Sequence, residues 1–112
     1  MYVVEQRRSA RFELHLPLRI LRTPVGRVSH DSLTQNISSG GVLFTSEVDA
    51  PIGGAIEYVV TLSTERDRHV DLRCFGKVVR LEKSRSKLQS PSYLIAATVD
   101  RYQLVRREPQ LG

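Results

Sequence analysis

A chain of 112 residues suits one domain with a modest core, and 40% hydrophobic and 26% charged residues are ordinary for a globular fold. The net charge of +5 favours anionic partners. No segment comes close to the run of about 20 apolar residues that a membrane-spanning helix needs. The one cysteine, Cys74, cannot form an internal disulfide, and the N-terminus has no apolar signal core. We therefore expect a soluble cytoplasmic protein in which Cys74 is a small buried residue.

Alternating apolar residues predict a first strand at residues 13–21, "ELHLPLRIL". Pro17 cannot donate a ladder hydrogen bond, so it suggests an edge or a bulge. Residues 22–32, "RTPVGRVSHDS", are predicted to be a loop or hairpin connection because they contain proline and glycine. Short strands are then predicted at residues 33–37 and 42–46, on either side of "SSGG".

Three further strands are predicted in the second half of the chain. Residues 56–62, "IEYVVTL", and residues 70–81, "VDLRCFGKVVRL", alternate between apolar and polar positions. Gly76 inside the second of these suggests a bend or a bulge. Residues 93–99, "YLIAATV", complete the set.

The predicted fold class is all-β: a six-stranded antiparallel β-barrel with a short C-terminal helical turn, because strands and turns alternate without intervening helices. Asp100 would cap the helical turn, and Pro109 would end it. The predicted organisation is a flexible arginine-rich arm over residues 1–12, the barrel over residues 13–100, and a short helix or tail over residues 101–112.

Three arginines, Arg7, Arg8 and Arg11, lie close together just before the first predicted strand. They repel one another and cannot lose their protons, so they must be solvated or paired. A guanidinium group binds phosphate oxygens, can make two hydrogen bonds to a guanine edge, and can stack on a base. Taken alone, the cluster fits either a solvated tail or an arm that binds an anion.

A second polar stretch, "NISSGG", lies between two predicted strands. Asn36 and Ser38 flank Ile37, so strand alternation places their side chains on one face while Ile37 points inward. Gly40 and Gly41 follow, and glycine permits a tight turn with positive φ and a close approach of the backbone to a ligand. Taken alone, the stretch fits a β-turn; beside an arginine arm it would form a small polar shelf.

In this order and at this spacing, the two stretches resemble the PilZ domain, a bacterial receptor for cyclic di-GMP. The family pattern has two motifs. The first is R-x-x-x-R near the start of the domain, and the second, further along the chain, is D/N-x-S-x-x-G. Here the first motif runs from Arg7 to Arg11 and the second from Asn36 to Gly41. The resemblance covers residues 5–100; family members commonly continue into a longer C-terminal helix, and this chain departs from them there.

The resemblance implies that an arm closes over a ligand lying on the barrel surface. The ligand-binding residues that it implies are Gln6, Arg7, Arg8, Arg11, Asn36, Ser38 and Gly41. Arg7 and Arg11 would bind phosphate and a guanine edge, and Arg8 would stack or contact phosphate. Gln6 occupies a position that affects whether one ligand or an intercalated pair of ligands binds. Because Gln6 is uncharged, it favours one ligand per domain.

On the shelf, Asn36 and Ser38 would hydrogen-bond a guanine or a phosphate, and Gly41 would leave room for the ligand. We expect no catalytic residues, no metal and no cofactor other than this ligand, since the three histidines are far apart in the sequence and there is one cysteine.

The predicted function is therefore that of a single-domain receptor which binds cyclic di-GMP and, as its arm orders, regulates an unidentified protein effector. We expect a monomer or a weak homodimer. One alternative is a small basic β-barrel that binds single-stranded nucleic acid, although the strands show no cluster of exposed aromatic residues for base stacking. The other is a PilZ adaptor that binds proteins without nucleotide, although the arginines that such members lack are intact here.

Overall fold

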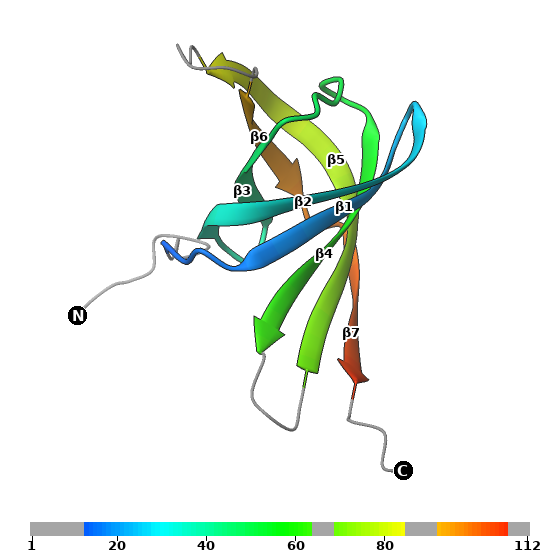
Figure 1. Cartoon of the computed structure of the whole chain (residues 1–112). Coiled ribbons are helices and arrows are strands. Elements are labelled where there is room, and N and C mark those ends of the chain that lie inside the picture. The colour runs from blue at the N-terminus through cyan, green and yellow to red at the C-terminus, as the bar shows by residue number, and fades with distance from the viewer. Residues whose placement is uncertain (1–12, 64–68, 85–91, 108–112) are drawn as a thin grey trace, which may run out of the picture.

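The computed structural model describes residues 13–63, 69–84 and 92–107, and these form seven strands and no helix (Figure 1). The strands are β1 (Pro17–Thr23), β2 (Gly26–Ile37), β3 (Gly41–Ser46), β4 (Ala55–Ser63), β5 (His69–Ser84), β6 (Ser92–Thr98) and β7 (Arg101–Arg107). They lie in the order β4-β1-β2-β3-β6-β5, and the pairing of β4 with β5 closes the ring. The predicted six-stranded antiparallel barrel is confirmed, with β7 added along β5.

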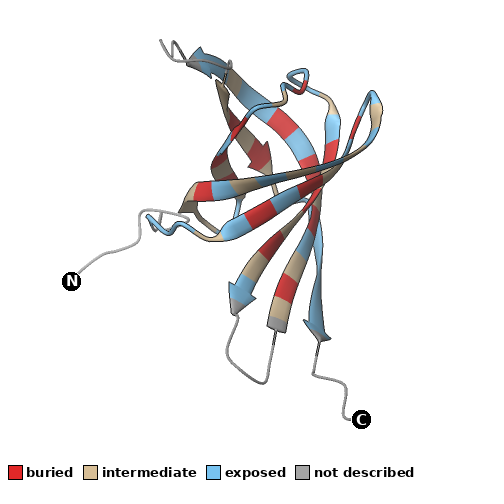
Figure 2. Cartoon of the chain, in the orientation of Figure 1, coloured by how far each residue is buried: buried red, intermediate tan, exposed pale blue. Residues whose placement is uncertain are grey.

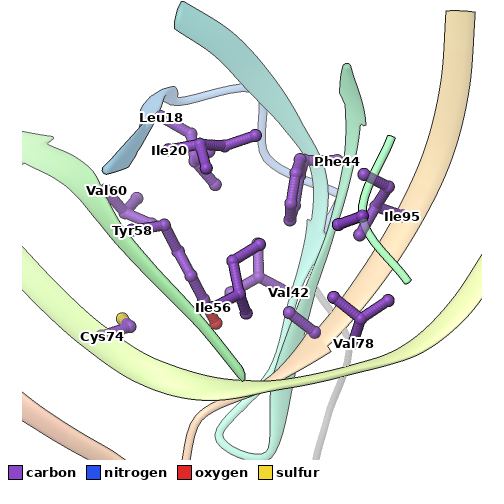
Figure 3. Packing of buried hydrophobic residues seen from close by; sticks show 12 residues of the cluster. Leu18, Ile20, Val42, Phe44, Ile56, Tyr58, Val60, Cys74, Val78 and Ile95 are labelled. Carbon is purple, nitrogen blue, oxygen red and sulfur yellow. The ribbon is translucent and has the colours of Figure 1, made fainter. Parts of the chain in front are cut away.

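The barrel interior is filled by the alternate side chains that the sequence pattern marked as apolar (Figures 2 and 3). In β4, for example, Ile56, Tyr58 and Val60 are all buried while the residues between them are more exposed. Burial of one large aliphatic or aromatic side chain contributes about 1.5–3 kcal/mol, so these inward positions determine the register of each strand. The buried core comprises Leu18, Ile20, Val42, Phe44, Ala50, Ile56, Tyr58, Val60, Cys74, Val78, Ile95 and Ala97.

Two details of β1 and β2 differ from the prediction. Residues 26–31 are not a loop but the first half of β2, and they pair with β1. This half of the hairpin has no fully buried residue, and Val28 is its one apolar residue, so the sequence carries too little alternation to predict a strand. Pro17 is the first residue of β1, a position at which proline is tolerated, and the β1 register shifts further along, between Ile20 and Arg22.

The predicted C-terminal helical turn is wrong, because Arg101–Arg107 forms strand β7. The N–H of Asp100 donates to the carbonyl of Phe75 at 2.9 Å, so Asp100 starts strand pairing and does not cap a helix. Pairing with β5 satisfies backbone groups of both strands, which outweighs a weak local preference for helix. Residues 108–112, with Pro109, lie outside the described residues.

Strands β6 and β7 follow the same edge of β5 in succession, and the chain between them passes close to Gly76 of β5. A β carbon at Gly76 would lie 1.8 Å from the carbonyl oxygen of Thr98. That oxygen accepts a hydrogen bond from the Tyr58 hydroxyl at 3.0 Å, and the Thr98 hydroxyl accepts one from the N–H of Lys77 at 2.9 Å. Gly76 thus permits Thr98 to pass close to β5, so that the chain can leave β6 and continue into β7.

The thiol of Cys74 is buried in this core, as expected, and donates to the Leu72 carbonyl at 3.7 Å. Burial raises the pKa of the Cys74 thiol from its ordinary value of 9.0 to about 11. We expect the folded protein to resist alkylation by iodoacetamide at pH 8, where the unfolded chain reacts readily. Alkylation of the native protein at the rate of a free thiol would contradict this.

The same shift predicts a loss of stability in alkaline solution. The pKa of Cys74 is higher in the folded chain than in the unfolded chain. The contribution of its protonated thiol to the free energy of unfolding is therefore complete below about pH 9 and is lost as the pH rises to about 11. Over that window the free energy of unfolding should fall by about 1.4 kcal/mol per pH unit. Burial also raises the pKa of Tyr58, which adds to the loss above about pH 10. Urea titrations at several pH values should show that Cys74→Ala removes the first part of this slope.

Candidate functional site

A bulge near the end of β2 turns Asn36 toward the outside of the barrel. The pairing of β2 with β3 shifts register between Thr34 and Asn36, which leaves Gln35 as an extra residue in β2. Thr34 is fully buried and Ile37 packs against the core, so two residues separate inward positions where a regular strand has one. Without the bulge, Asn36 would share the buried face with Thr34. The predicted inward direction of Ile37 is confirmed.

The turn after β2 is held by a set of hydrogen bonds centred on Ser38. The N–H of Ser38 donates to the Gly41 carbonyl at 2.9 Å, and its hydroxyl donates to the same carbonyl at 3.4 Å. The N–H of Gly40 donates to the Ser38 hydroxyl at 3.3 Å, and the Gly40 carbonyl accepts from the N–H of Val99 at 3.1 Å. Ser38 therefore shapes the turn, in addition to any contact it makes with a ligand. Asn36, in contrast, makes no side-chain hydrogen bond within the described part of the chain.

The two glycines of the turn serve different purposes from those expected. Among the described glycines only Gly26 and Gly53 have positive φ, so the expectation of positive φ at Gly40 or Gly41 is wrong. At Gly41 a β carbon would lie 2.8 Å from the carbonyl oxygen of Ala97 in β6, so the close contact seen here is with β6, and the expected approach to a ligand stays a prediction. Gly41 thus allows β3 and β6 to pair tightly beneath the shelf.

A pocket of about 360 Å³ opens beside this turn, over β3, β5 and β6. It is lined by Asn36, Ile37, Ser38, Gly40, Gly41, Val42, Leu43, Val79, Arg80, Ala96, Ala97 and Thr98. The structure thus brings together Asn36, Ser38 and Gly41, the three predicted site residues that it describes.

Sequence reasoning missed Val79 and Arg80, which β5 contributes to the same pocket. One signal was present: "KVVRL" has two valines in succession, and in a strand one of them must face outward. Val78 is fully buried, whereas Val79 is 55% exposed and offers an apolar surface to a ligand. The β5–β6 register shift between Val78 and Arg80 could not be read from the sequence.

Arg80 supplies a positive charge at the pocket, next to the acidic Glu82. Its Nε donates to a Glu82 carboxylate oxygen at 2.8 Å, and both side chains are about half exposed. An exposed ion pair of this kind is worth at most about 1 kcal/mol, so an anionic ligand can compete for the Arg80 guanidinium. The pocket therefore combines an amide without a hydrogen bond to the described residues, an exposed aliphatic surface and an available cation.

The start of the described chain is tied to β2 close to Asn36. Pro17 pairs with Leu33, and the residues before it continue along β2. The N–H of Thr34 donates to the Leu16 carbonyl at 2.9 Å, and the N–H of Leu16 donates to the Thr34 hydroxyl at 2.8 Å. That hydroxyl in turn donates to the carbonyl of Leu14. Residues 14–16 thus run beside the strand that carries the shelf.

Four of the predicted site residues, Gln6, Arg7, Arg8 and Arg11, lie outside the described residues, and so does the whole arm over residues 1–12. A larger hollow of about 810 Å³ lies elsewhere, on the outer face of β1, β4 and β5. Its Arg19 Nε donates to Asp31 at 2.8 Å, which lowers the pKa of Asp31. This hollow contains neither motif, so the pocket beside Asn36 is the candidate site.

A protein-family model described as "PilZ domain" matches residues 5–93, which spans both motifs and the strands from β1 into β6. No curated protein and no solved structure matches the chain significantly. Within the described residues, no helix is long and apolar enough to cross a membrane, and no group of three His, Cys, Asp or Glu side chains could hold a metal ion.

Proposed function

Since the chain belongs to the PilZ domain family, whose members are generally cyclic di-GMP-binding domains, we propose that it is a cytoplasmic receptor for this dinucleotide. Cyclic di-GMP would lie in the pocket beside the "NISSGG" turn, with the arginine arm folded over it. PilZ domains are binding or adaptor domains, and the role proposed here is recognition without catalysis.

The observation that carries this proposal is the position of residues 14–16, which follow the arm in the sequence and run beside the shelf. Hydrogen bonds with Thr34 fix Leu14 and Leu16 against β2, two residues before Asn36 on that strand. Consecutive Cα atoms are about 3.8 Å apart, so the three bonds from Leu14 to Arg11 span at most about 11 Å. An arginine side chain adds several more ångströms, so Arg11 is within reach of a ligand in the pocket.

The chemistry of the pocket suits a guanine dinucleotide with two phosphates. The Asn36 amide, which bonds to none of the described side chains or backbone groups, can bind a base edge or a phosphate, and Val79 has an exposed aliphatic face for a base. Arg80 would join Arg7 and Arg11 in neutralising the phosphates. Each hydrogen bond to a charged group is worth about 1.5–3 kcal/mol. Three or four of them, offset by ordering of the arm, give micromolar affinity, about −8 kcal/mol.

Ordering of residues 1–12 on binding would change the surface that the barrel presents, and this change would regulate a protein effector. The uncharged Gln6 offers no extra cation to a second dianion, so we propose one ligand per domain. A stoichiometry near one in a calorimetric titration would support this.

Isothermal titration with cyclic di-GMP tests the proposal directly. We expect micromolar binding, and a loss of about 10–100-fold for Asn36→Ala, since one or two hydrogen bonds to a charged ligand are removed. Gln103→Ala is the matched control, because Gln103 is an exposed amide on β7 and lies outside the pocket. Absence of heat at about 50 µM ligand, or unchanged binding by Asn36→Ala, would contradict the proposal.

A further inference from the structure

We propose that the outer edge of β7 is a docking site for an extended acidic segment of a partner protein, which adds a strand to the sheet beside β7. This proposal concerns a different surface from the dinucleotide pocket and does not depend on nucleotide binding.

The first supporting observation is the open edge of β7. Strand β6 is paired on both sides, with β3 and with β5. Strand β7 continues along the same edge of β5 and stands at the end of the strand order, with no second partner among the described strands (Figure 1). Its outward backbone N–H and C=O groups therefore form a row that can bind another strand.

The second observation is the apolar surface of β7 on the face that continues the barrel core. Tyr102 lies opposite Cys74 and Leu104 lies opposite Leu72, which packs against the core. Tyr102 is 65% exposed and Leu104 is 54% exposed (Figure 2 shows β7 in the colour of exposed residues). An added strand would cover these side chains with its own apolar residues at alternate positions.

The third observation is the charge on the opposite face. Arg101 lies opposite Phe75, with its guanidinium 4.6 Å from the ring centroid, and Arg73 lies 5.5 Å from the same centroid. Stacking on Phe75 fixes the Arg101 guanidinium on this face of the sheet, whereas Arg73 is also bonded to Glu57 of β4, on the other side of β5. Strand β7 contains three arginines and no acidic residue. An added strand with carboxylates on this face would therefore pair with opposite charge, which contributes about 0.2–1 kcal/mol for each cross-strand pair.

Charge also argues against a second copy of this chain as the occupant. In an antiparallel pair of β7 strands centred on Leu104, Arg101 of one copy would lie opposite Arg107 of the other. Like charges directly opposite each other destabilise a strand pair. A foreign acidic strand avoids this repulsion, so the partner is a different protein.

The test uses amide NMR of the full chain without nucleotide. The probe is an acetylated and amidated peptide, Glu-Val-Glu-Thr-Glu-Val-Glu, and the comparison peptide has lysine in place of each glutamate. We expect the acidic peptide to shift the amides of β7 with a Kd of about 0.1–1 mM, with peptide–protein NOEs along the strand. The lysine peptide should bind at least tenfold more weakly.

Charge reversal provides the matched variants. Arg101→Glu should weaken the acidic peptide at least about threefold and strengthen the lysine peptide, because an attractive cross-strand pair becomes a repulsive one. Lys83→Glu changes the net charge equally at an exposed position of β5 outside the β7 pairing, and should leave binding at β7 within about twofold. Unshifted β7 amides at about 2 mM acidic peptide, or equal shifts with both peptides, would overturn the proposal. So would β7 shifts that follow protein concentration alone, because they would show self-association.

Discussion

Replacing Gly76 by alanine should destabilise the barrel by about 3–5 kcal/mol. The new methyl group would lie 1.8 Å from the Thr98 carbonyl oxygen and 2.6 Å from its carbonyl carbon, and both are backbone atoms that cannot rotate away. Overpacking costs about 1–3 kcal/mol, and displacing Thr98 would also break its bonds to Tyr58 and Lys77, worth about 1 kcal/mol each. Small domains have only about 5–15 kcal/mol of stability, so this variant should be marginally folded.

Urea denaturation monitored by circular dichroism measures this effect. Gly40→Ala is the matched control, because a β carbon at Gly40 has no atom within 4 Å and the residue does not have positive φ. It should change the free energy of unfolding by less than about 1 kcal/mol. If Gly76→Ala unfolded at the same urea concentration as the wild type, the close approach of Thr98 to Gly76 would be wrong.

Replacing Arg7 and Arg11 together by alanine should lower the affinity for cyclic di-GMP by at least about 100-fold, with little change in stability. Each arginine is proposed to make charge-assisted hydrogen bonds worth about 1.5–3 kcal/mol, so losing both removes about 3–6 kcal/mol. The buried core of the described residues lies within β1 to β6 and the segment around Ala50, so thermal unfolding should be nearly unaffected. Calorimetric titration of both proteins measures the difference.

Two further variants separate specific contacts from general charge. Arg101→Ala/Arg106→Ala removes the same net charge from β7 and should bind the dinucleotide within about threefold of the wild type. Arg7→Lys/Arg11→Lys keeps the charge but loses the planar fork, so we expect an intermediate affinity. If the alanine variant of Arg7 and Arg11 bound as tightly as the wild type, the arm would have no part in recognition.

The sequence was informative wherever one face of a strand is buried. Residues 56–62 alternate because Tyr58 and its neighbours at every second position enter the core, and β4 has almost the predicted bounds. The first half of β2 carries a weaker signal because none of its residues is fully buried, and Pro24 and Gly26 at its start suggested a loop. Residues 101–107 were misread for a related reason: all the side chains of β7 from Arg101 to Arg106 are exposed, and pairing with β5 determines its conformation.

The candidate site was predictable in its residue types and not in its geometry. Asn36, Ser38 and Gly41 could be identified from a motif, and they do line one pocket. The bulge at Gln35 depends on the pairing of β2 with β3, which no local pattern encodes. Arg80 joins the pocket through a second shift in register, between β5 and β6. Contacts between strands distant in the sequence therefore supplied what the motif could not.

The hydrogen bonds around Ser38, together with the bond from Val99 to Gly40, have a thermodynamic consequence for recognition. They hold the shelf in one conformation before any ligand arrives, so this side of the pocket is preorganised and loses little entropy on binding. In the proposed complex the entropic penalty then falls on residues 1–12, and we expect the stiffness of this segment to influence the dissociation constant. Natural variants could tune their threshold for the messenger through the composition of residues 1–12 without altering the barrel.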